Sequence, residues 1–265
     1  MTVYSRGAGI MGFFLSVNAL LFFSGLLFLF GNERRMIETG TGDYGLYLRT
    51  FFFTVLLLLL AVLFLVPART VSSVSKERDS GTLDVMLASG LSPLRIASGT
   101  FFSAFLLSIC ILFSCFPALF LPLIYGGVSF SECLYVLLSF VPLILFLLSC
   151  GLFGSSAGKS QVSGICICYG LILALMAGPV LLSFLIKPFF EAGKNTGVCL
   201  MLMCPGTSVL SMLLDLTGGK GYLRSFLSAA GYAGAILSPA RQILISSGIS
   251  AGFSALLFFL AVKKM

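Results

Sequence analysis

The chain has 265 residues, of which 58% are hydrophobic and only 9% are charged, and its formal net charge is +7. Because soluble domains carry about 25% charged residues, a chain this apolar predicts a protein whose solvent is a lipid bilayer. The basic residues stand singly at the ends of apolar runs, which is typical of membrane flanks and does not indicate a nucleic-acid partner. The absence of histidine excludes His-dependent hydrolases and His-ligated zinc or haem sites.

Six apolar runs predict an all-α, polytopic integral membrane protein with six transmembrane helices, organised as a single domain over residues 1–265. About 20 apolar residues cross a bilayer as a helix, and none of the six runs contains Asp, Glu, Lys or Arg. The first run is longer than the apolar core of a signal peptide, so we expect it to be retained as a span. The predicted spans are residues 8–30, 50–68, 96–125, 133–157, 161–186 and 243–262.

The long mixed segment 187–242 separates the fifth and last predicted spans. Pro205-Gly206 interrupts its first apolar piece and favours a turn, so we expect a re-entrant or interfacial segment here. Two further spans, giving eight, are the alternative and leave the chain ends on the same side. Lys and Arg are evenly divided between the two sides until this segment is discounted, and they then favour cytoplasmic N- and C-termini.

A charged segment, residues 72–95, separates the second and third predicted spans. Ser80-Gly81-Thr82 predicts a break, after which Thr82 is expected to cap a short helix of about two turns. Gly90 predicts the left-handed end of this helix. Ser92-Pro93 then predicts the cap and the first position of the next helix.

The short helix carries an apolar face that needs a partner. Its i, i+3, i+4 spacing places Leu83, Met86 and Leu87 on one side. A helix that lies on a lipid surface usually carries Lys and Arg on its polar face, whereas this one carries Asp84 and no basic residue. Spacing alone leaves two interpretations open, a membrane-surface helix and a helix that binds in the groove of another protein.

The motif Glu77-x-x-x-Gly81-Thr82-Leu83, followed by Leu87 and by Ser92-Pro93 before a new span, resembles the type-2 ABC transporter permease family. More loosely, it is similar to the branch of gliding-motility and nitrous-oxide-reductase accessory permeases. The number of spans, the segment "CPGTSVLSMLLDLTGG" and the basic end "KKM" agree with this resemblance.

The resemblance implies a multi-pass permease subunit of the cell (plasma) membrane, surrounded by membrane lipid, which forms the pathway of an exporter. It implies two partners, a separate ABC ATPase subunit and a second permease copy or a sister permease. The charged segment would be the coupling helix on which the ATPase docks. By this resemblance, the ATPase-docking residues are Glu77, Gly81 and Thr82, which shape an elbow, and Leu83, Met86 and Leu87, which contact the ATPase.

A phosphate-binding loop is disfavoured at "FGSSAGKSQ", residues 153–161, because the spacing is one residue short and Phe153 replaces the first glycine. We therefore expect no enzyme activity and no cofactor in this chain, with ATP bound by the partner subunit. Gly248-x-x-x-Gly252 fits close helix packing, such as contact with a second copy. An ion-coupled transporter is a weaker alternative, because the predicted spans hold no ionisable residue. A non-transporting membrane anchor of an ATPase would use the same docking helix.

Overall fold

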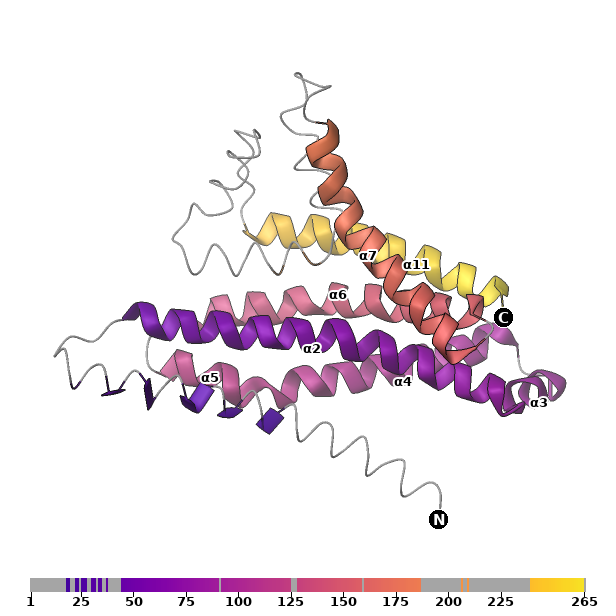
Figure 1. The fold of residues 1–265 in the computed structure, drawn as a ribbon, viewed down its shortest axis with the longest axis horizontal. Coiled ribbons are helices and arrows are strands. Elements are labelled where there is room, and N and C mark those ends of the chain that lie inside the picture. The colour runs from indigo at the N-terminus through magenta and orange to yellow at the C-terminus, as the bar shows by residue number, and fades with distance from the viewer. Residues whose placement is uncertain are drawn as a thin grey trace, which may run out of the picture. The chain divides into compact units, whose positions relative to one another are not determined.

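The computed structural model describes residues 44–90, 92–124, 128–158, 160–186 and 239–264, with isolated positions between 18 and 37 and at 206 and 209. In these parts of the chain every regular element is an α-helix, so the predicted all-α class is confirmed (Figure 1). The helices are α2 (Tyr44–Asp79), α3 (Thr82–Ala88), α4 (Pro93–Ser114), α5 (Phe116–Ile124), α6 (Phe130–Ala157), α7 (Gln161–Ile186) and α11 (Pro239–Lys264).

Five helical stretches of the described chain are long and apolar enough to cross a membrane, which confirms a polytopic membrane protein. They correspond to the second to sixth predicted spans. The first predicted span, 8–30, falls for the most part outside the described residues, and so does the segment 187–238. The five stretches are Leu48–Asp79, Pro93–Phe120, Phe130–Ala157, Gln161–Gly178 and Leu244–Lys264.

The second span is much longer than predicted. Helix α2 does not stop at residue 68 but continues to Asp79, giving 36 residues and a length of about 54 Å at 1.5 Å per residue. This exceeds the hydrocarbon core of a bilayer, which is about 30 Å thick. The extension is helical because Val71, Val74 and Ser75 form a buried face at i, i+3, i+4 spacing. Residues 72–79, the first third of the charged segment, are therefore part of α2.

The third span also differs from the prediction of one helix over 96–125. It starts at Pro93, the helix start predicted from Ser92-Pro93, but it is interrupted at Cys115, where α4 gives way to α5. The Cys115 amide is shared between the carbonyls of Ile111 and Leu112, each at 3.2 Å, as is common where a helix tightens at its end. Pro117 cannot donate a hydrogen bond to the preceding turn, which explains a break at this place.

The chain divides into two compact units, Met1–Val62 with Ile109–Tyr135 and Leu63–Ser108 with Val136–Met265. In the second unit, a core cluster of Val74, Leu152 and Ala261 joins the last turns of α2, α6 and α11. Phe101 near the start of α4 packs edge-on against Phe258, with ring centroids 5.5 Å apart. The ends of α2, α6 and α11 and the start of α4 therefore gather at one end of this unit, which we call the α3 end.

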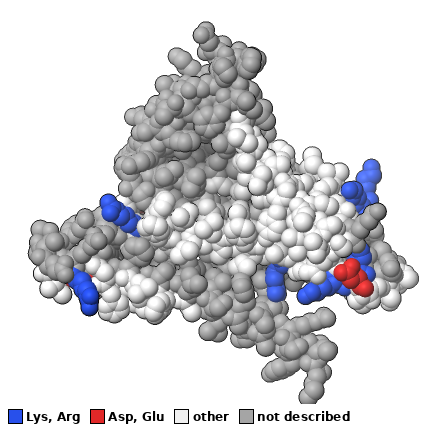
Figure 2. Space-filling view, viewed as in Figure 1, with Lys and Arg blue, Asp and Glu red and all other residues white. Residues whose placement is uncertain are grey.

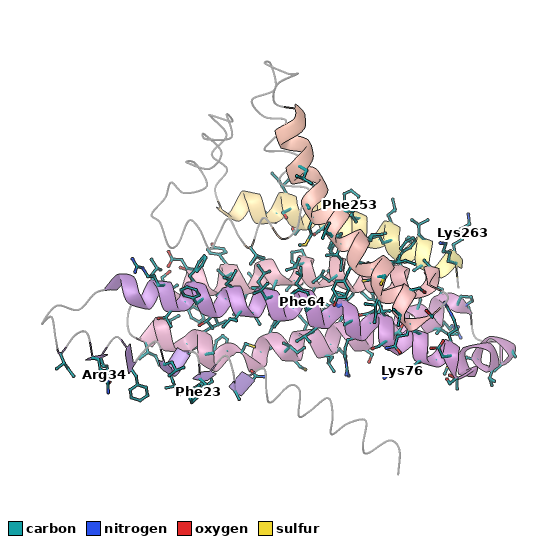
Figure 3. All side chains as sticks on the ribbon, in the orientation of Figure 1. Phe23, Arg34, Phe64, Lys76, Phe253 and Lys263 are labelled. Atoms are coloured by element: carbon teal, nitrogen blue, oxygen red, sulfur yellow. The ribbon has the colours of Figure 1, made fainter. Side chains whose placement is uncertain are left out.

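Charged side chains gather at the α3 end, whereas the surface beside it is uncharged (Figure 2). Lys76 and Lys263 both lie there, on α2 and α11 (Figure 3). Lys264 stands over the ring of Phe153, 5.4 Å from its centroid, and so ties the end of α11 to α6.

Two residues of the segment 187–238 are described, Gly206 and Val209, and both are helical. The turn predicted at Pro205-Gly206 is therefore not observed at Gly206. Whether residues 187–238 form a re-entrant segment or two further spans cannot be read from these two positions, because the rest of the segment lies outside the described residues. Helix α7 begins at the α3 end and α11 finishes there (Figure 1).

Candidate functional site

The connection from α2 to α4 is shaped by two glycines in the left-handed backbone region. Gly81 has φ +70° and Gly90 has φ +83°, values at which any other residue would be strained. At the first turn, the amide of Ser80 donates to the Lys76 carbonyl at 3.1 Å and the amide of Gly81 donates to the Arg78 carbonyl at 3.0 Å. These bonds close α2, and the seven residues of α3 follow immediately. The predicted left-handed stop at Gly90 is confirmed.

Thr82 does not cap α3 as predicted, because it is the first residue of that helix and its hydroxyl points back to α2. The hydroxyl donates to the Glu77 carbonyl at 2.9 Å. Ser80 Oγ lies 3.2 Å from the same carbonyl and 2.9 Å from Thr82 Oγ1. The last carbonyls of a helix lack partners within it, and the turn at Gly81 brings these hydroxyls over them. The elbow thus unites Glu77, Gly81 and Thr82, with Glu77 contributing its backbone.

Helix α3 exposes two large apolar side chains. Met86, on the predicted docking face, is 37% exposed, and Val85, which the sequence analysis did not single out, is 69% exposed. The side chains of Leu83 and Leu87 lie outside the described residues, so their docking role stays a prediction. The helix ends at Ala88, and Ser92 then accepts the amides of Arg95 and Ile96 through its carbonyl at 2.9 and 3.3 Å. The predicted restart of a helix at Pro93 is confirmed.

Arg78, which sequence reasoning missed, ties the elbow to the connection between α6 and α7. Its Nη1 donates to the carbonyl of Gly158 at 2.5 Å in a partly buried position. Gly158 follows the last residue of α6, so this carbonyl is one of the unpaired acceptors at the negative end of the α6 dipole. A spacing rule could not have found this pair, because its members are 80 residues apart and the acceptor is a backbone atom.

Helix α6 and the residue that follows it, Gly158, pack against the neighbouring helices at backbone distance through three glycines. A Cβ at Gly151 would lie 2.7 Å from Thr70 Cβ on α2, and a Cβ at Gly154 would lie 2.7 Å from Cys168 Cβ on α7. At Gly158 it would lie 2.5 Å from the amide nitrogen of Gly164, also on α7. None of these positions can hold a side chain without a shift of the neighbouring helix. Small residues three or four apart are the usual signal for such packing in membranes, and they were present in α6.

The glycine pair that was predicted for packing is not used within the described chain. A Cβ at Gly248 or at Gly252 would meet nothing within 4 Å, and both positions are exposed. Contact of this pair with another chain therefore stays a prediction.

The resemblance of residues 153–161 to a phosphate loop has a structural explanation. Phe153–Ala157 belong to the last turns of α6, and the Gly158 amide donates to the Gly154 carbonyl at 3.0 Å. The glycines of this stretch serve the contact with α7. After Gly158, Ser160 and Ser163 exchange amide-to-hydroxyl bonds of 3.0 and 3.3 Å that cap the start of α7. No cluster of His, Cys, Asp or Glu in the described ranges is arranged to hold a metal ion.

Helix α7 is also fastened to the middle of α2. The Tyr169 hydroxyl donates to the carbonyl of Phe64, and the centroids of the two rings lie 6.1 Å apart. Pro67, inside α2, has no amide hydrogen, so the helix is weakened one turn after this bond. The carbonyl that Pro67 leaves without an intrahelical donor is that of Leu63, next to the Phe64 carbonyl that Tyr169 bonds.

Helix α11 joins α6 through a buried polar contact. Ser254 Oγ lies 2.7 Å from Ser149 Oγ and donates to the Leu145 carbonyl at 3.2 Å. Hydrogen bonds between spans contribute to helix association where hydrophobic attraction between helices is absent.

One family model matches the chain over a range that includes α2 to α7 and all but the last residue of α11. The family model described as ABC-2 family transporter protein matches residues 36–263. The chain belongs to the ABC-2 transporter family. No curated protein and no solved structure matches it. This ABC-2 permease is therefore a multi-pass membrane component of an ABC transporter, a class whose ATP hydrolysis resides in a separate partner subunit.

Proposed function

We propose that this ABC-2 permease forms the translocation pathway of an exporter and is driven by an ABC ATPase subunit that docks on residues 75–95. The observation that carries the proposal is α3 itself, a seven-residue helix held between two left-handed glycines and exposing Val85 and Met86. An apolar helix turned out from the membrane spans suits a protein groove, because it carries no basic residue for a lipid surface. The assignment to the gliding-motility and nitrous-oxide-reductase accessory branch belongs to this proposal.

The permease binds no cofactor of its own in this proposal, and the ATPase subunit supplies the energy. ATP-driven closure of two ATPase subunits displaces α3 and tilts the spans attached to it. This scheme requires two permease chains, either two copies or one copy with a sister permease. The open positions Gly248 and Gly252 on α11 support a helix contact between them.

The N- and C-termini are cytoplasmic in this proposal. The end of α11 lies at the α3 end, held there by Ala261 and by Lys264 over Phe153. The C-terminus and the docking helix therefore face the same compartment, which is the cytoplasm if a cytoplasmic ATPase binds α3. Lys76, Lys263 and Lys264 at this end agree with the preference of basic residues for the cytoplasmic side.

Purification of the tagged permease from its native membrane in mild detergent tests the docking. We expect a stoichiometric ATPase to accompany the wild type and to be lost in Met86→Asp and Leu87→Asp, because a carboxylate on the docking face would be desolvated. Ser73→Asp is the matched control, since it places the same charge at an exposed position of α2 just before the docking segment and should keep the ATPase. Absence of any ATPase from the folded wild type would contradict the proposal.

Vesicle experiments separate a transporter from a membrane anchor. Permease–ATPase complexes reconstituted into lipid vesicles are expected to move cargo from a cell extract only when ATP is present on the ATPase side. A complex that hydrolyses ATP and moves nothing would favour the anchor alternative. Movement that needs an ion gradient and no ATP would favour the ion-coupled alternative.

A further inference from the structure

We propose that Arg78 is a positioning residue that locks the α2–α3 elbow to the α6–α7 connection, so that a displacement of α3 is passed to α6 and α7. The inference deepens the proposed function and rests on it, because α3 is taken as the helix that the ATPase moves. The lock itself is a property of the permease alone and can be measured without the ATPase.

Two consecutive residues in the last turn of α2 each form a hydrogen bond to a different part of the chain. On one side, the Thr82 hydroxyl of α3 donates to the Glu77 carbonyl at 2.9 Å. On the other side, the next residue, Arg78, donates through Nη1 to the Gly158 carbonyl at 2.5 Å. A path of bonded groups therefore runs from the first residue of α3, through a single turn of α2, to the end of α6.

The electrostatic setting favours a guanidinium at this point. Arg78 lies in the last turn of α2, and its acceptor Gly158 directly follows the end of α6. The C-terminal ends of both helices carry partial negative charge, so a cation between them stabilises both. A hydrogen bond from a charged donor is roughly twice as strong as a neutral one, and partial burial reduces its screening by salt.

The α6–α7 connection can pass on a displacement because it is packed without space. Gly158 meets the backbone of Gly164, and Gly154 meets Cys168, so the end of α6 and the start of α7 move together. A Cβ at Gly164 would in turn lie 3.1 Å from Val71 on α2. Close-packed elements transmit a shift as rigid bodies.

Without the lock, the elbow would absorb the movement of α3. Gly81 is a left-handed glycine at which an added Cβ would meet nothing within 4 Å, so the hydrogen bonds of the elbow are the restraint that the described residues show at this position. Hinges are usually a few such positions that take up a change in backbone angle. We therefore expect that, when the ATPase displaces α3, the Arg78–Gly158 bond directs the movement into the spans, and that without this bond the backbone bends at the elbow instead.

The test is the distance between α3 and the α6–α7 connection. Probes are placed at the exposed positions Ala88 and Ser160 as unnatural amino acids, since eight native cysteines prevent selective thiol labelling. In the purified wild-type permease we expect a narrow distance distribution. Arg78→Gln should broaden it and shift it to longer values. Lys76→Gln is the matched control, because it removes the same charge from an exposed position of the same turn and should leave the distribution unchanged.

The same labelled pair is then followed in the permease–ATPase complex, nucleotide-free and trapped with ATP and vanadate. In the wild type the distance is expected to stay constant between the two states, whereas it should change in those Arg78→Gln complexes that retain the ATPase. An unchanged distribution in Arg78→Gln, or a wild-type distance that differs between the states, overturns the lock. The second result requires no variant and so holds even if Arg78→Gln fails to fold. Failure of any ATPase to bind the wild type contradicts the proposed function and leaves the measurement on the permease alone to decide the lock.

Discussion

The hydroxyl of Thr82 donates a hydrogen bond of 2.9 Å to the carbonyl of Glu77, across the left-handed turn at Gly81. The first residue of α3 is thereby attached to the last turn of α2, and the angle between the two helices is fixed by a side chain as well as by the backbone. The bond is exposed, so its net contribution to stability is modest, and its value lies in the orientation that it gives to α3.

Thr82→Val, which keeps the shape of the side chain and removes its hydroxyl, is expected to loosen the elbow. The change should cost about 1 kcal/mol locally, and amide hydrogen exchange over residues 80–90 should become faster because the Glu77 carbonyl loses a donor. Ser89→Ala is the control, since it removes a hydroxyl that bonds the Met86 carbonyl at the far end of α3. Equal exchange in Thr82→Val and the wild type would show that the backbone alone holds the elbow.

Gly154→Ala is expected to destabilise the packing of α6 against α7. The added Cβ would lie 2.7 Å from Cys168 Cβ and 2.8 Å from the Gly164 carbonyl, so one helix must shift. Overpacking of this kind typically costs about 1–3 kcal/mol, which should lower the midpoint of thermal unfolding in detergent. Gly170→Ala on α7 has open space around it and should keep or raise the midpoint, because Ala is the better helix former. The same loss in both variants would argue against close packing at Gly154.

Tyr169→Phe is expected to weaken the attachment of α7 to α2. The variant keeps the ring beside Phe64 and removes the hydroxyl that bonds the Phe64 carbonyl. A loss of about 1 kcal/mol is expected for one hydrogen bond, measured as the concentration of a denaturing detergent that unfolds half of the protein. Tyr135→Phe, at an exposed tyrosine of α6, should have no effect. A Tyr169→Phe protein as resistant as the wild type would contradict the supporting role of this hydroxyl.

Gly252→Leu is expected to reduce association of two permease chains, if α11 forms the contact proposed above. A Cβ at this exposed position would meet nothing within 4 Å, so monomer stability should be kept while the cross-linked dimer decreases. Gly170→Leu adds the same side chain to an open position of α7 and should leave the dimer yield unchanged. Equal dimer yields in the two variants would place the contact between chains elsewhere.

The membrane class and five of the spans could be predicted from the sequence because each span is a long apolar run free of charge. The end of α2 could not, since the apolar run stops at Ala68 while the helix continues through the buried Val71 and Val74. The sequence of a helix in which charged and buried residues alternate resembles that of a loop, because the neighbouring helices that bury its apolar side chains are not visible in the sequence. Tertiary packing, and not local hydrophobicity, therefore sets this boundary.

The candidate site was predicted in outline and missed in detail. Backbone geometry follows from local chemistry, so the left-handed Gly90 and the helix start at Pro93 were predicted correctly. The partner of Arg78 is a carbonyl on another helix, which no local pattern specifies. The glycine spacing of Gly248 and Gly252 was as suggestive as that of Gly154 and Gly158, and only the structure distinguishes the open pair from the packed pair.

Gly81 and Gly90 also have a consequence for how partner choice can change. The seven residues of α3 lie between these two left-handed glycines, and an added Cβ at either glycine would meet nothing within 4 Å. If the ATPase docks on α3 as proposed, substitutions within residues 83–88 would change the surface that it contacts and leave the Thr82–Glu77 bond of the elbow in place. In that scheme, exchanging this short helix between related permeases of one membrane would assign each of them to a different ATPase.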